Sequence, residues 1–181
     1  MTIKRRLAAL AAAALLIVSL SACAVNMPGE ESSSGSESTS STASENESSS
    51  QAPVDAGDYD DTLEGLAEYM KAKGYIEGDP SDMDASFIGA EKGVKYTGSY
   101  EGTNNITVEL YEYDTANLND TAKAIIDSVK ESGQFTLMGM TANATLSDSG
   151  KYLMVYTDTV TGEEHDARTA EVKEEFVNFK K

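Results

Sequence analysis

The sequence predicts an α+β fold: a small antiparallel sheet of about four or five strands, with helices packed mainly on one face. Segments with apolar residues three or four positions apart, typical of helices, interleave with segments in which apolar and polar residues alternate, typical of strands. A stretch rich in serine and glutamate precedes them and has neither pattern. We therefore expect a signal segment at 1–22, a disordered tether at 23–58 and one globular domain at 59–181.

Three segments of the predicted domain have the apolar spacing of amphipathic helices. They cover about 62–73, 120–131 and 164–179. Asp61 and Glu64 form a plausible capping pair at the start of the first helix. The apolar positions of the three segments are Leu63, Leu66, Ala67 and Met70, then Ala122, Ile125, Ile126 and Val129, then Val172, Phe176 and Phe179. Each helix therefore presents one face to a core.

Five segments have strand character, at about 94–100, 106–113, 135–138, 141–146 and 151–157. Alternation is clearest in the second segment, where every other residue is aliphatic: Ile106, Val108 and Leu110. The resulting order is helix, two strands, helix, two or three strands, helix. This order indicates an antiparallel sheet with helices packed against it.

The first 23 residues have the pattern of a secretory signal. A cationic start of Lys4, Arg5 and Arg6 precedes an apolar run at 7–20, and Leu-Ser-Ala-Cys ends the signal at Cys23, the only cysteine. This ending resembles the lipobox of bacterial lipoproteins. The resemblance implies that Cys23 becomes the mature N-terminus and carries a diacylglyceryl thioether. The alternative is an uncleaved transmembrane helix, because the stretch from Leu7 to Val25 is close to the ~20 residues that a span needs.

Both interpretations place the rest of the chain outside the cytoplasm, because the cationic start stays inside. We expect a lipoprotein of the cell membrane, anchored through Cys23 on the extracytoplasmic face. Removal of 1–22 leaves 11 Lys and Arg against 31 Asp and Glu. Such a surface repels nucleic acid, whose binding depends on cations that neutralise phosphates. The expected partners are the membrane and an envelope protein or cell-wall ligand, with the chain itself monomeric.

The sequence has no recognisable catalytic constellation. Its single histidine, His165, lies in a polar run, and we expect it to be solvated near a helix start. A zinc site needs several His or Cys ligands at set spacing. The acidic run at 79–84 lacks the spacing and central glycine of a calcium-binding loop, so a solvated turn with a helix cap at Ser81 fits it better. We predict no catalytic residue, no metal site and no cofactor.

Tyrosine and methionine side chains occupy alternate positions of two predicted strands, opposite to the aliphatic positions. They are Tyr111, Tyr113, Tyr152, Met154 and Tyr156. If both strands belong to one sheet, one face is aliphatic and takes the helices, and the other is a Tyr/Met face suited to binding a partner. The alternative is that the first helix, or the loop at 79–93, covers the Tyr/Met face.

Three segments of the predicted domain carry a resemblance to other proteins. They are Val-Glu-Leu-Tyr-Glu-Tyr-Asp at 108–114, Asn-Ala at 143–144 and Gly-Lys-Tyr-Leu-Met-Val-Tyr-Thr-Asp at 150–158. They are similar to a small domain in lipoproteins of Gram-positive gut anaerobes, where a strand ending in Tyr-x-x-Asp leads into a helix and then into a Gly-x-Tyr-Leu-x-Val strand. The resemblance implies a fold and a location, but no activity and no functional residues.

These observations together predict a non-enzymatic binding or accessory module of the cell envelope. The alternative is a carboxylate-dependent hydrolase of envelope glycans. That reaction needs two carboxyl groups about 5–9 Å apart across a cleft, with one of them kept protonated. In a chain with 31 Asp and Glu, paired carboxylates arise by chance, so their presence alone does not favour the hydrolase.

Overall fold

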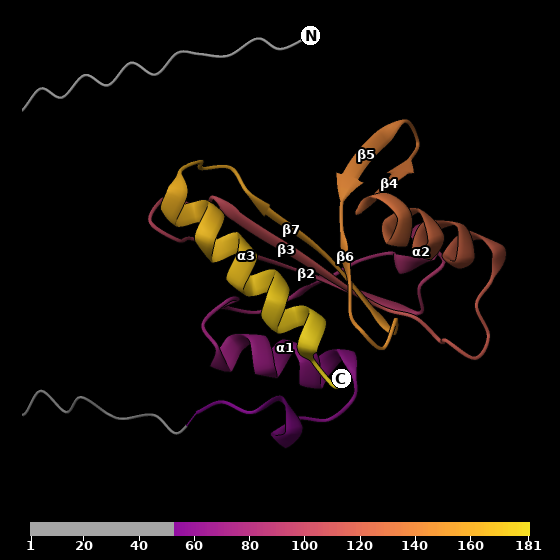
Figure 1. The fold of residues 1–181 in the computed structure, drawn as a ribbon, viewed down its shortest axis with the longest axis horizontal. Coiled ribbons are helices and arrows are strands. Elements are labelled where there is room, and N and C mark those ends of the chain that lie inside the picture. The colour runs from indigo at the N-terminus through magenta and orange to yellow at the C-terminus, as the bar shows by residue number, and fades with distance from the viewer. Residues whose placement is uncertain (1–52) are drawn as a thin grey trace, which may run out of the picture. The chain divides into compact units, whose positions relative to one another are not determined.

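The computed structural model describes residues 53–181 (Figure 1). The predicted signal segment, Cys23 and nearly all of the predicted tether lie outside these residues. Within them, a five-stranded antiparallel sheet has the order β1-β2-β3-β7-β6, and a separate hairpin joins β4 to β5. Three α-helices pack on the sheet, so the predicted α+β class is confirmed.

The elements follow one another in nearly the predicted places. The sheet strands are β1 (Ser81–Asp82), β2 (Lys92–Gly98), β3 (Ile106–Glu112), β6 (Thr145–Leu146) and β7 (Tyr152–Asp158), and the hairpin strands are β4 (Gln134–Leu137) and β5 (Met140–Asn143). The helices are α1 (Leu63–Ala72), α2 (Asp120–Ser132) and α3 (Glu163–Asn178), with short 3₁₀ turns η1 (Ala56–Asp58) and η2 (Ala85–Ile88).

Packing begins before residue 59, where the sequence placed the start of the domain. Val54 and Ala56 lie against the core, and the Asp55 side chain caps η1 by accepting a hydrogen bond from the Gly57 N–H at 2.7 Å. These apolar residues follow directly on the serine-rich stretch. Burial of their apolar side chains offsets the entropy lost when this segment becomes ordered, whereas serine side chains would gain little from burial.

Helix capping explains where α1 and α2 begin. Thr62, rather than Asp61, is the N-cap of α1, and its hydroxyl oxygen accepts from the Gly65 N–H at 3.0 Å. Asn119 caps α2 in the same way, accepting from the Ala122 N–H at 2.8 Å. Side-chain caps satisfy N–H groups that have no partner inside the helix.

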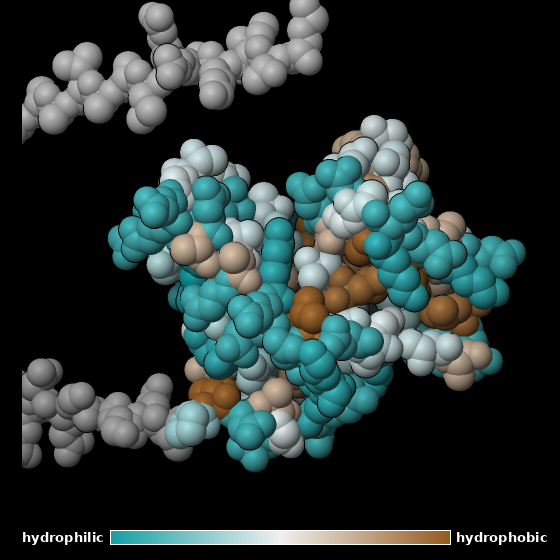
Figure 2. Space-filling model, viewed as in Figure 1, coloured by the Kyte–Doolittle hydropathy of each residue, from teal (hydrophilic) through white to brown (hydrophobic). Residues whose placement is uncertain are grey.

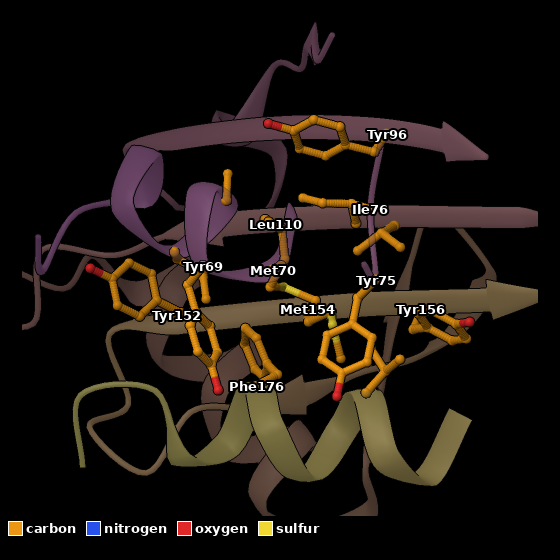
Figure 3. Packing of buried hydrophobic residues seen from close by; sticks show 14 of the residues in the cluster. Tyr69, Met70, Tyr75, Ile76, Tyr96, Leu110, Tyr152, Met154, Tyr156 and Phe176 are labelled. Atoms are coloured by element: carbon orange, nitrogen blue, oxygen red, sulfur yellow. The ribbon is translucent and has the colours of Figure 1, made fainter. Parts of the chain in front are cut away.

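The two faces of the sheet carry separate cores. α1 and α3 cover one face, and α2 with η2 covers the other. Figure 3 shows the first core, where Met70, Leu110, Met154 and Phe176 meet between the two helices and the strands. Just beyond α3, the buried ring of Phe179 lies 5.5 Å from Tyr69 and 5.7 Å from Tyr152, measured between ring centroids.

We predict that Phe176→Ala lowers the free energy of unfolding by about 3–5 kcal/mol, because the ring is fully buried and its removal leaves a cavity. Urea unfolding followed by circular dichroism measures the change. Phe87→Ala is the matched control, since Phe87 is 55% exposed, and we expect it to change stability by less than about 1 kcal/mol. Equal losses in both variants would contradict the assignment of Phe176 to the core.

Candidate binding pocket

The predicted Tyr/Met face does not exist, and this prediction is wrong. In the sheet, Val108 pairs with Tyr156 and Leu110 pairs with Met154. Residues paired across antiparallel strands point to the same side, so the aliphatic residues of β3 share a face with the tyrosines and methionine of β7. All five predicted residues are buried: Tyr111, Tyr113, Tyr152, Met154 and Tyr156.

The five residues are divided between the two cores. α1 and α3 cover Tyr152, Met154 and Tyr156, and α2 with η2 covers Tyr111 and Tyr113. Both coverings weighed in the sequence analysis are therefore present, one on each face, because η2 belongs to the loop at 79–93.

The hydroxyl groups of Tyr111, Tyr113 and Tyr152 have partners inside the protein. Tyr152 donates to the Asp61 carboxylate at 2.8 Å, and Tyr111 donates to the Glu109 carboxylate at 3.0 Å. Burial raises the pKa of both tyrosines, and the neighbouring carboxylates raise it further. These hydroxyls stay protonated and serve as donors within the fold.

A pocket of about 220 Å³ lies between the end of α1, the strand β2 and the first half of α3. Its floor is aliphatic, formed by Ile76, Ile106 and Val108. Four tyrosines form its walls: Tyr75, Tyr96, Tyr100 and Tyr156. Figure 3 places Tyr75, Ile76 and Tyr156 close together beside the sheet, with Tyr96 on the strand above them. Aromatic walls over an aliphatic floor are typical of small-molecule sites.

Gly74 lets the chain build one side of this pocket. Its φ of +72° is a left-handed conformation that glycine adopts without strain, and it ends α1. The chain then turns back so that Tyr75 and Ile76, the next two residues, are both buried. The sequence predicted that this helix ends at about residue 73, close to its end in the structure, but gave no sign that a pocket follows it.

Arg168 of α3 holds two of the tyrosine walls in place. Its guanidinium lies 4.6 Å from the ring centroid of Tyr75 and 5.0 Å from that of Tyr100. It also donates to the Gly74 carbonyl oxygen at 2.6 Å and lies 3.6 Å from a Glu171 carboxylate oxygen. Because these partners engage most of the guanidinium, Arg168 is chiefly a structural part of the wall.

Lys71 is the cation at the rim that has no carboxylate partner. Its Nζ lies 5.2 Å from the ring centroid of Tyr96, and it forms no ion pair within residues 53–181. Glu77 is the only acidic residue that lines the pocket, and it lies beside Gly98, where a Cβ atom would come within 3.2 Å of its Oε1. The rim therefore offers one unpaired ammonium group over an aromatic ring.

His165 is not solvated, contrary to the sequence-based prediction. It is 8% exposed, and its Nδ1–H donates to the Asp158 carboxylate at 2.7 Å. The other oxygen of Asp158 accepts from Asn105 at 2.8 Å and from the Val160 N–H at 2.9 Å. The prediction failed because only the short turn from β7 into α3 brings this carboxylate to the histidine.

This network holds the start of α3, whose N-cap residue, Gly162, has no side chain to cap it. Burial alone would raise the pKa of the Asp158 carboxyl, but hydrogen bonds from Asn105 and His165 outweigh that effect and lower it. Asp158 is therefore an ionised acceptor, a poor choice for a general acid. The ring of Tyr100, a wall of the pocket, packs edge-on against His165 with 5.6 Å between ring centroids.

The acidic run at 79–84 is largely exposed, as predicted, but Ser81 lies in a strand and caps no helix. Ser81 and Asp82 form β1 and pair with β2, and the cap of η2 is Asp84. Within the described residues, no group of three or more His, Cys, Asp or Glu side chains is placed to hold a metal ion. The same part of the chain contains no helix long and apolar enough to cross a membrane.

The chain was compared with known proteins at three levels. No protein-family model matches it, and neither the curated proteins nor the solved structures give a match. The resemblance to small domains of Gram-positive lipoproteins therefore stays a prediction, and the function has to be argued from the pocket.

We predict that Asp158→Asn lowers the free energy of unfolding by about 1.5–3 kcal/mol at pH 7, because the replaced group is a buried, ionised acceptor. The folded-state pKa of Asp158 is lower than its unfolded value of about 3.9. The stabilisation is thus present above pH ~4 and is lost as the pH falls through the folded-state pKa.

Urea unfolding at pH 7 and pH 3 tests this dependence. We expect the difference in the free energy of unfolding between wild type and Asp158→Asn to be smaller at pH 3 than at pH 7. Asp127→Asn, on the exposed face of α2, is the control, and it should follow the wild type at both values. A gap that stays constant with pH would mean that the charge of Asp158 contributes nothing.

Proposed function

We propose that this protein is a membrane-anchored lipoprotein of the extracytoplasmic face whose domain binds a small amphipathic anion in the Tyr75–Tyr96 pocket. The sequence of residues 1–23 supports the anchor at Cys23. We infer that the ligand is an anion because Lys71, at the rim of the tyrosine-lined pocket, has no carboxylate partner within residues 53–181. The protein acts as a monomer, without enzymatic activity and without nucleic acid.

The charge of the chain narrows the choice of ligand. The formal net charge is −17 at pH 7, so the long-range field repels polyanions. A ligand with a single carboxylate or similar group loses little to that field and gains a contact with Lys71 at short range. Its body would be a ring or short acyl group that fits on the tyrosine walls and the aliphatic floor. Small cell-wall fragments and other envelope metabolites include molecules of this kind.

A carboxylate-dependent glycan hydrolase remains the alternative prediction, but the pocket supports it less. Only one carboxylate, that of Glu77, lines this pocket, and two are needed for the reaction. The carboxyl groups whose pKa is clearly displaced all have it lowered: Glu64, Asp114, Asp158 and Glu175. A general acid needs the opposite displacement.

We predict that Lys71→Glu weakens the retention of an anionic small molecule by the full-length chain. The chain is incubated with the low-molecular-mass fraction of a cell-envelope extract, washed, and analysed for bound compounds by mass spectrometry. Retention should fall at least about tenfold, equivalent to about 1.4 kcal/mol. The reason is that the variant places a carboxylate where the ligand's anion binds.

Lys130→Glu is the matched control, because it makes the same charge change on an exposed residue of α2, across the sheet from the pocket. It should retain the compound as the wild type does. Equal retention by Lys71→Glu and Lys130→Glu would overturn the assignment of Lys71. A captured compound that is released as a cleaved product would favour the hydrolase instead.

A further inference from the structure

The sheet opens between β5 and β7, on the far side of β7 from β3. β5 and β6 are separated by a single residue, Ala144. In β6, Thr145 pairs with Met154 and Leu146 pairs with Leu153. The same register would bring the preceding residues of the strand onto β7. Instead β5 turns away and pairs with β4, as Figure 1 shows to the right of β7.

The backbone groups of β7 that face this opening can be identified from the hydrogen bonds at its start. Lys151 O accepts from the Tyr113 N–H at 2.8 Å, on the β3 side, whereas Tyr152 O accepts from the Ser147 N–H at 3.0 Å, on the β6 side. Along a strand, the backbone N–H and C=O groups of successive residues point to alternate sides. Tyr156 and Asp158 therefore point their N–H and C=O groups into the opening.

The facing edge of β5 is unpaired as well. Ala144 N–H donates to the Gly133 carbonyl at 2.9 Å, which is on the β4 side. The Gln134 carbonyl, opposite Asn143, turns away from β5 and accepts from the Ser128 hydroxyl at 2.8 Å. By the same alternation, the backbone groups of Asn143 and Thr141 point toward β7.

A groove of about 440 Å³ occupies the opening, and all four of these residues line it. We call it the split-sheet groove. Figure 2 shows the surface notched between the part that contains α3 and the part that contains the hairpin. Two strand edges with unpaired N–H and C=O groups form a template for one more extended backbone.

The wall contributed by α3 has a charge at each end. Asp166, Thr169 and Lys173 all line the groove, and their spacing of three and four residues puts them in one row along the helix. Neither Asp166 nor Lys173 forms an ion pair within residues 53–181. α3 follows β7 after a short turn and runs back along it, so Asp166 is near the Asp158 end and Lys173 is nearer to Val155.

We propose that the split-sheet groove binds an extended segment of another polypeptide, which adds as a strand antiparallel to β7. Antiparallel pairing is more stable than parallel pairing, and it places the amino end of the segment near Asp166. Asp166 and Lys173 are about 10 Å apart along the helix axis. Side chains two and four residues apart on one face of a strand are separated by about 7 and 13 Å. Seven helical residues span about 10.5 Å, which is nearer to the four-residue spacing of a strand than to the two-residue one. We therefore infer a segment with a basic residue followed, four positions later, by an acidic one.

The probe for this proposal is the peptide Thr-Lys-Thr-Val-Thr-Glu-Thr, with the charge-exchanged Thr-Glu-Thr-Val-Thr-Lys-Thr as its matched control. Fluorescence anisotropy with the full-length chain measures the affinity for each labelled peptide. Hydrogen–deuterium exchange read by mass spectrometry reports which amides become protected. We expect the first peptide to bind at least tenfold more tightly and to slow exchange at 141–143 and 156–158. The double variant Asp166→Lys with Lys173→Glu should reverse the preference between the peptides.

Asn143→Pro separates strand addition from contact with side chains alone. It removes an N–H that points into the groove and donates to no strand of the fold, whereas Asn143→Ala keeps that N–H and removes the same side chain. We expect binding to be lost in the first variant and kept in the second. Equal affinity for both peptides, equal binding by both variants, or protection elsewhere in the chain would overturn the proposal. So would protection of the groove by a second copy of the chain, seen as slower exchange at higher protein concentration without peptide. Lys71→Glu leaves the groove intact, so this test is independent of the pocket.

Discussion

The pairing of β3 with β7 is the constraint on which the rest of the domain depends. These two strands are covered on both faces, and their register decides which side chains each core receives. Val108 and Leu110 enter the core of α1 and α3 together with the aromatic side chains of β7. A shift by one residue would exchange the contents of the two cores. The pocket and the split-sheet groove both rest on this pair, since Tyr156 lines one with its ring and the other with its backbone.

Acidic residues far outnumber the few Lys and Arg residues of this protein, and several of these cations contact more than one side chain. The chain has 14 Lys and Arg against 31 Asp and Glu, and several of the cations lie over a tyrosine ring as well as beside a carboxylate. At the α1 side of the sheet, Lys92 and Lys151 share the nearly buried Glu112, and each also reaches a second acid, Glu64 or Asp61. Shared partners of this kind satisfy more carboxylates with fewer cations. Within the described part of the chain, Lys71 and Lys173 take part in no such pair, and each lines one of the two proposed binding sites.

Features that depend on near neighbours in sequence could be predicted, and features that depend on distant ones could not. The apolar faces and approximate ranges of the helices follow from residues a few positions apart, and the structure has them close to where the sequence placed them. The Tyr/Met face failed because alternation shows which residues of one strand share a side, but not which side of the next strand they join. The pocket combines residues from Lys71 to Arg168, and its tyrosines show no common spacing. A sequence signal for the buried His165–Asp158 pair was available, since an acidic strand end and a histidine only seven residues apart flank a glycine turn.

The position of Phe179 has a consequence for the biogenesis of the protein. Its ring closes the core against Tyr69 of α1 and Tyr152 of β7, so the first helix of the domain completes its packing only when the residue after α3 is in place. A chain threaded through a membrane from its amino end delivers residue 179 after every helix and strand of this domain. If the protein is exported as proposed, the domain stays open and translocation-competent until residue 179 emerges, and it then folds on the far side. Late closure of the core would thus keep folding from competing with secretion.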